Sequence, residues 1–171
     1  MKTSIAALLL LMPVAMWGGP IASFEQISPT PTTYLQGVDF DSFALSLSGT
    51  AIGEVQELGN LGCYPSDFVG FTPGRIAMVG RGICTFSVKG INAESAGAIG
   101  FIVVNNVAGF SSGTYVAGSV PDIPGVLVTQ SLGSSLAQTE GLVVRIDIVP
   151  EPATWMLAAG GFALLVLRRR R

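Results

Sequence analysis

The sequence predicts a domain of the α+β class, in which a β-sheet forms the core and two helices lie against it. The clearest strands are residues 75–79 and 101–104, two short apolar runs that are bounded by glycines or asparagines. Between these strands, Thr85 is suited to cap a helix that stops near Gly97. Gly90 weakens this helix by about 1 kcal/mol relative to alanine, so packing must hold it in place.

The first 22 residues have the pattern of a secretory signal peptide. Lys2 precedes an apolar core at residues 5–16, and small residues follow up to Ala22. We therefore expect residues 1–22 to be removed by cleavage near Ala22. The alternative is an uncleaved anchor, although an apolar core of roughly 12 residues is short for a membrane span.

Residues 23–38 are expected to form a flexible lead-in. They hold Pro29 and Pro31 among serines and threonines, a composition that is typical of an extended and poorly ordered segment. The folded domain is therefore expected to begin after this lead-in.

Two strands should open this domain. Alternation of Phe43, Leu45 and Leu47 predicts a half-buried strand over residues 40–47, and a turn at Ser48 and Gly49 leads to a second strand over residues 50–57. The later elements expected from the same rules are a strand over residues 125–129, a helix over residues 131–139 that Ser131 caps, and a final strand over residues 142–148.

The C-terminal end carries an apolar run over residues 153–167, followed by the arginine cluster Arg168, Arg169, Arg170 and Arg171. These charges would hold the C-terminus in the cytoplasm. At about 1.5 Å per residue the run reaches about 22 Å as a helix, which is less than the ~30 Å hydrocarbon core of a bilayer. A temporary anchor therefore fits better than a permanent one.

Pro150, Glu151 and Pro152 stand directly before this short span. Together with the arginine cluster they resemble the PEP-CTERM sorting signal of Gram-negative bacteria. The resemblance implies that residues 149–171 are recognised and cleaved by a membrane exosortase, so that a precursor tethered to the inner membrane yields a product at the cell surface or outside the cell. An ordinary tail anchor is the alternative.

The chain between the two ends is acidic. Residues 23–150 hold four basic and ten acidic side chains, and four minus ten gives a net charge of −6. An acidic surface repels phosphate backbones, so nucleic acid is not expected as a partner.

Candidate catalytic groups are few, because the chain contains no histidine. Ser-His-Asp and Cys-His mechanisms are excluded within this polypeptide, since each needs an imidazole to accept the nucleophile's proton. Residues 109–113 spell G-x-S-x-G but lie in a predicted loop without a base, which favours a chance match. Ser87 and Lys89 are two positions apart on a helix and face different sides, which argues against a Ser-Lys dyad.

No metal or cofactor is predicted. Asp39 and Asp41 share one face of a strand and are spaced to touch calcium, but solvated carboxylates are the preferred interpretation. Two cysteines without a histidine cannot complete a zinc site.

A series of positions in the middle of the chain resembles the protease-associated (PA) domain, a non-catalytic module of subtilases, some peptidases and sorting receptors. The resemblance implies a compact β/β/α domain, with a sheet core and two peripheral helices, over residues 39–148. The matching positions are Gly62, Cys63, Pro65, Asp67, Phe68, Gly74, Arg75, Ile76, Ala77, Val79, Arg81, Gly82, Cys84, Thr85, Phe86, Asn92, Ala93, Ala96, Gly97, Ala98, Asn105 and Asn106.

Cys63 and Cys84 are the two cysteines of the chain, and a disulfide between them is expected after export to an oxidising compartment. Both fall on cysteine positions of the PA pattern in certain subtilases, which supports the pairing. Closing this loop should stabilise the fold by about 3 kcal/mol in the chain-entropy model.

These features predict a non-catalytic exported protein that binds peptide, protein or extracellular polysaccharide. The alternative is a PA module that acts in trans on a secreted protease. Residues 108–122 are expected to form a long surface loop that is rich in glycine and serine. Together with residues 64–71, this loop is the expected binding surface. The candidate contact residues are Tyr64, Phe68, Phe71, Phe110 and Tyr115.

Overall fold

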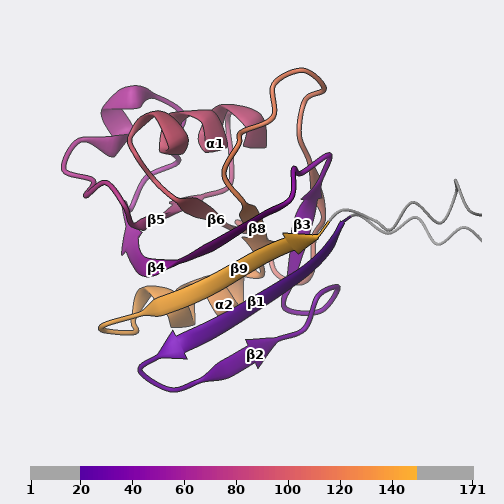
Figure 1. Cartoon of the computed structure of the whole chain (residues 1–171), viewed down its shortest axis with the longest axis vertical. Helices are drawn as coiled ribbons and strands as arrows, with labels where there is room; N and C mark the ends of the chain where they lie inside the picture. Colours follow the sequence, from indigo (N-terminus) through magenta and orange to yellow (C-terminus); the bar gives the residue numbers. More distant parts are fainter. Residues whose placement is uncertain (1–19, 150–171) are drawn as a thin grey trace, which may run out of the picture.

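The computed structural model describes residues 20–149 and confirms a mixed sheet with two α-helices (Figure 1). The strand order is β2-β1-β9-β4-β5-β6-β8-β3-β7. The strands are β1 (Ile21–Ser28), β2 (Thr32–Tyr34), β3 (Phe40–Ala44), β4 (Gly49–Glu57), β5 (Ile76–Gly80), β6 (Gly100–Val104), β7 (Gly113–Thr114), β8 (Gly125–Val128) and β9 (Val143–Val149). The helices are α1 (Phe86–Ser95), α2 (Gln130–Ala137) and a short 3₁₀ helix, η1 (Pro65–Phe68).

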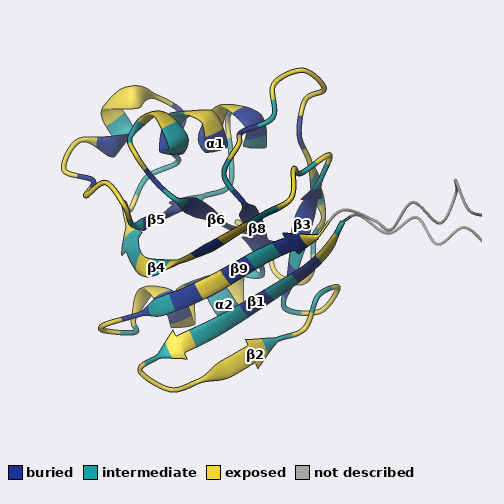
Figure 2. Cartoon of the chain, in the orientation of Figure 1, coloured by how far each residue is buried: buried dark blue, intermediate teal, exposed yellow. Residues whose placement is uncertain are grey.

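Four parallel strands, β4, β5, β6 and β8, form the centre of the sheet. Figure 2 shows β5, β6 and β8 almost entirely buried, as expected for strands that are covered on both faces. On one face, Ala77 and Val79 pack with Ala93 of α1, and on the other face Met78 packs in the cluster of Leu136 from α2. Because side chains alternate between the two faces of these strands, the strands contribute to two apolar layers, one on the side of α1 and one on the side of α2.

Helix α1 begins as predicted, because the Thr85 side chain accepts a hydrogen bond from the Val88 amide. Gly97, with φ of +85°, follows the helix as its C-terminal stop. Gly90 is buried, and a Cβ atom at this position would lie 2.6 Å from Cγ of Pro121 and 2.8 Å from Cζ of Phe101. Glycine therefore allows α1 to lie close to the sheet, although it is a poor helix former.

Helix α2 starts earlier than predicted. Thr129, rather than Ser131, caps it, since the Thr129 hydroxyl accepts from the amide of Leu132, and the helix ends at Ala137. Both threonine and serine are good N-caps, so the sequence alone does not choose between neighbours.

The predicted strand over residues 40–47 is too long. Strand β3 ends at Ala44, the next residue, Leu45, has φ of +71°, and both Leu45 and Leu47 are exposed. Nor does β3 form a hairpin with β4, because β3 pairs with β8 and β7 on the far side of the parallel strands.

The flexible lead-in predicted for residues 23–38 is also corrected. These residues form most of β1, which pairs with β9 in the sheet, and β2, which pairs with β1. Phe24 is fully buried in the core, and Pro29 and Pro31 lie at the turn between the two strands, where they interrupt no ladder. The domain therefore begins at Ile21, and a cleavage that leaves β1 whole falls before this residue.

The described chain starts and ends at the same end of the sheet, since Ile21 pairs with Val149. Strand β4 starts beside them, where Gly49 pairs with Ile148, and runs away from them (Figure 1). The carboxyl ends of the parallel strands consequently lie at the opposite end. The sorting motif, with Pro150 to Pro152 and the arginine cluster, and most of the predicted signal peptide lie outside the described residues. Within residues 20–149, no helix has the length and apolar character needed to span a bilayer.

Candidate functional site

A cleft of about 560 Å³ lies at the carboxyl ends of β4, β5 and β6, where α2 forms one side. Its lining includes the apolar residues Met78, Val79 and Val104, of which the first two are almost fully buried. Gly133 of α2 belongs to the same lining, and a Cβ atom there would lie 2.2 Å from Cγ1 of Val104, so glycine lets the helix lie close to β6. Sheets with parallel strands commonly bind ligands at this end.

Four polar side chains around the cleft are exposed and form no hydrogen bond with any residue of the described part of the chain. Glu57 is the last residue of β4, and Asn106 lies two residues beyond β6. Gln130 is the first residue of α2, and Gln138 directly follows that helix. Together these residues offer one carboxylate and three carboxamides to a ligand. They are Glu57, Asn106, Gln130 and Gln138.

Arg81 forms a fixed polar group at the same cleft. Its Nη1 donates to Oδ1 of Asn105 at 2.8 Å and to Oγ of Ser111 at 3.0 Å, and the guanidinium lies 5.9 Å from the centre of the Phe86 ring. Asn105 is buried and donates to the carbonyl of Gly109. Ser111, the serine of the G-x-S-x-G match, therefore serves as an acceptor that ties the loop to the strand end.

The predicted disulfide is present and fixes another side of the cleft. Cys63 and Cys84, whose Cα atoms are 5.7 Å apart, follow closely after the lining residues Leu61 and Arg81. Asp67 Oδ2 accepts from the Cys63 amide at 2.7 Å, so a carboxylate as well as a covalent bond holds this turn.

Lys89 is fully buried beneath this turn. Its Nζ donates to the carbonyl of Leu61 and lies 3.6 Å from Sγ of Cys63. Burial lowers the pKa of Lys89 to about 8, and the negative charge of Asp67 opposes part of that effect. The neighbouring Ser87 hydroxyl instead accepts from the amide of Val116 at 2.8 Å, so Ser87 and Lys89 do not form a dyad.

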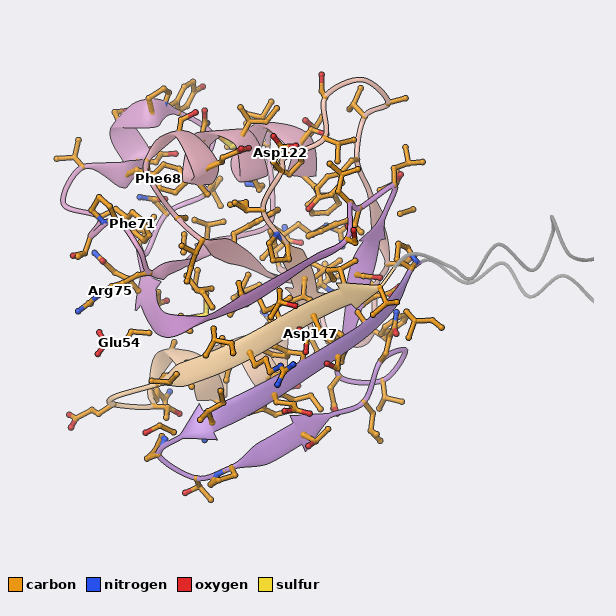
Figure 3. The ribbon with its side chains drawn as sticks, in the orientation of Figure 1. Glu54, Phe68, Phe71, Arg75, Asp122 and Asp147 are labelled. Carbon is orange, nitrogen blue, oxygen red and sulfur yellow. A yellow bond between two sulfur atoms is a disulfide. The ribbon has the colours of Figure 1, made fainter. Side chains whose placement is uncertain are left out.

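The five predicted contact residues are not gathered on one surface. Tyr64 and Phe110 are 63% and 46% exposed. Phe68, Phe71 and Tyr115 are only 7%, 8% and 3% exposed and belong to the core beside α1. Figure 3 labels the first two of them. These three aromatic rings hold their loops against the domain, because burying a large apolar ring stabilises the folded state.

Asp39 and Asp41 serve the local structure. A carboxylate oxygen of Asp39 accepts from the Leu35 amide at 2.9 Å, and Asp41 accepts from Nε2 of Gln36 at 3.1 Å. Within residues 20–149 there is no group of three potential metal ligands from His, Cys, Asp or Glu.

A second hollow, of about 660 Å³, lies at the other end of the sheet, but its charged groups are already paired. Arg145 Nε donates to Asp147 Oδ2 at 2.6 Å, and Ser23 Oγ donates to the same oxygen at 3.3 Å. Sequence reasoning missed the first cleft and its free side chains. The available signal was the position of polar residues at or shortly after the carboxyl ends of strands, as at Glu57 and Asn106.

Residues 48–136 match the PA domain family, and the chain belongs to this family. Residues 149–171 match the PEP-CTERM protein-sorting motif. The two matches define an exported protein that is sorted to the cell surface and carries a PA module.

The relatives of this chain include several aminopeptidases. Leucine aminopeptidase 2 of Arthroderma otae is 36% identical over 104 residues, which are 59% of this chain and 21% of that enzyme. An aminopeptidase of Pseudomonas aeruginosa is 31% identical over 147 residues, which are 77% of this chain and 27% of the enzyme. The chain thus spans between about a fifth and about a quarter of the length of these two relatives.

Solved structures show the same fold. An aminopeptidase from Aneurinibacillus sp. strain AM-1 superposes with a TM-score of 0.61 at 21% identity, covering 77% of this chain and 31% of that one. A zinc aminopeptidase from Bacillus subtilis gives 0.59 at 22% identity over the same shares.

Proposed function

We propose that this protein is a non-catalytic surface protein whose PA domain binds an extended peptide segment in the cleft beside α2. The observation that carries the proposal is a cleft at the carboxyl ends of the parallel strands, lined by four free polar side chains and by apolar residues. A ligand can satisfy these groups without breaking any bond within the described domain.

The chemistry of the cleft favours a polypeptide. Each carboxamide of Asn106, Gln130 and Gln138 offers both a donor and an acceptor, which matches the N–H and C=O groups of a peptide backbone. Glu57 adds a negative charge to an acidic domain, so the preferred segment is neutral or basic. A hydroxyl-rich polysaccharide is the competing ligand, and the experiment below separates the two.

The position of the cleft suits a protein that is tethered through its C-terminus. Strand β4 runs for nine residues from the end where Val149 leads to the sorting motif toward the end with the cleft. At about 3.3 Å per residue this is a separation of roughly 26 Å. While a precursor is held in the inner membrane before exosortase cleavage, the cleft would face away from the bilayer.

A second candidate is a PA module that acts in trans on a secreted protease. The similarity to aminopeptidases favours it, because in those enzymes a PA-like region is part of the same chain as the peptidase. A secreted peptidase that is retained by the immobilised protein, through the same cleft residues, would support this candidate.

The test uses the processed protein from culture medium, immobilised and probed with an array of unrelated peptides and with extracellular polysaccharide. We expect selective peptide binding that weakens about tenfold, or about 1.4 kcal/mol, in the Glu57→Gln, Asn106→Ala double variant. Glu25→Gln on β1 makes the same charge change at a distant site and should leave binding unchanged. Binding of polysaccharide alone, or equal effects of both variants, would refute a peptide cleft.

A further inference from the structure

The disulfide has two chemically different sulfur atoms. Cys63 is buried, and its Sγ lies 3.6 Å from the amine of Lys89. Cys84 is half-buried, and its neighbours Ile83 and Thr85 are both exposed. An incoming thiolate therefore reaches Cys84 more easily than Cys63.

The leaving group also differs between the two directions of attack. When a thiolate attacks one sulfur of a disulfide, the other sulfur departs as a thiolate, and departure is faster when that thiolate is more stable. A nearby ammonium group stabilises a thiolate. Lys89 contacts Cys63, so access and leaving-group stability both favour attack on Cys84.

We propose that Cys63, Cys84 and Lys89 form a thiol–disulfide exchange centre, in which Cys84 is the modification site for a small-molecule or protein thiol. The incoming thiol loses its proton to solvent, and its sulfur forms a bond with Sγ of Cys84. The bond between Cys84 and Cys63 breaks, and its electron pair goes to Cys63. The incoming sulfur is thus oxidised, Cys63 is reduced to a thiolate, and the ammonium of Lys89 pairs with it.

The other groups around Lys89 fit this role. The Leu61 carbonyl accepts a hydrogen bond from Lys89 Nζ and holds the amine next to the sulfur. Asp67 is the charged group that acts on Lys89, and it favours the protonated amine. With the pKa of Lys89 at about 8, most of the amine is charged at neutral pH.

The test is exchange of the secreted, oxidised protein with reduced glutathione, followed by mass spectrometry of the peptides. The expected adduct is on Cys84. Lys89→Met should slow the reaction roughly fivefold at pH 7, because the leaving thiolate loses its counter-charge. In the wild type, the rate constant per glutathione thiolate should fall above about pH 8 as Lys89 loses its proton.

A matched control separates charge from loosening of the turn. Asn92→Ala removes the hydrogen bond from Nδ2 of Asn92 to the Gly62 carbonyl, 3.2 Å long, without changing any charge. This variant should react as fast as the wild type or faster. An adduct on Cys63, or a Lys89→Met protein that exchanges as fast as the Asn92→Ala protein, would overturn the proposal. If Lys89→Met does not fold, the adduct position and the pH profile of the wild type decide.

Discussion

The two ends of the sheet are held together in different ways. At the end where the described chain starts and finishes, β1 and β9 pair along their length, and the charged groups of the hollow bond to one another around Asp147 (Figure 3). At the opposite end, long connections replace strands, and a disulfide and the buried Lys89 fix them. Beside them, the side chains of Glu57, Asn106, Gln130 and Gln138 form no hydrogen bond with any residue of the described chain.

This difference has a physical reason. A strand satisfies its backbone groups through its neighbours, so β1 needs only pairing and one buried aromatic ring to stay in place. The segment between β4 and β5 is bonded mainly through turns and side chains instead of neighbouring strands. A loop of this length has a large conformational entropy in the unfolded chain, which a cross-link reduces. At this end the disulfide and Lys89 therefore fix the connections, while the side chains around the cleft stay unpaired within the described residues.

The largest expected effect tests the end with β1. Phe24→Ala should lower the free energy of unfolding by about 3–5 kcal/mol, because Phe24 is fully buried against Phe40 and Tyr34. Ile27→Ala, on the same strand but 40% exposed, should cost less than about 1 kcal/mol. Denaturant unfolding measures both, and equal, small losses would restore the interpretation of this segment as a flexible lead-in.

The next effect concerns the cross-linked end. Replacing both Cys63 and Cys84 with serine should lower the stability by about 3 kcal/mol and leave β1 and β9 protected from hydrogen exchange. The largest increase in exchange should fall at residues 57–75, where local opening adds to the lower global stability. An unchanged denaturation midpoint under oxidising conditions would show that the bridge does not hold this end.

A smaller effect depends on pH and on Lys89. The folded-state pKa is about 8 and the unfolded value is close to 10.4, so between these values the unfolded chain binds more protons and stability rises with pH. Below pH 8 both states carry the proton, and the contribution is constant. Relative to Lys89→Met, the wild type should therefore gain roughly 2 kcal/mol between pH 7 and pH 10. Tyrosine ionisation contributes equally to both proteins and cancels when their free energies of unfolding are subtracted. A stability difference that does not change with pH would argue against a buried amine.

Much of this architecture was predictable from local sequence. Glycine-bounded apolar runs identify β5 and β6, and Thr85 and Gly97 mark the ends of α1. The pairing of Cys63 with Cys84 followed from the export context and the PA pattern. These features depend on short-range rules or on many matched positions.

The errors arise where the outcome depends on tertiary packing. The buried alternation of Ala22 and Phe24 identifies β1, but Pro29 and Pro31 suggested disorder because their place in a turn between strands is not visible locally. Tyr115 lies in a glycine-rich loop and is nevertheless in the core. The cleft joins residues from four separate segments, so only the topology of the parallel strands brings them together.

The most direct test of a peptide-binding cleft at the carboxyl ends of the parallel strands is an NMR titration of the isotope-labelled, processed protein with the tightest peptide from the array. We predict that the largest amide shifts fall at Gly80, Asn106 and Gln130, with little change at Ser23, Thr50 or Arg145. Shifts that are centred on the β1–β9 end, or on the tip of the loop at residues 108–112, would contradict this location of the site.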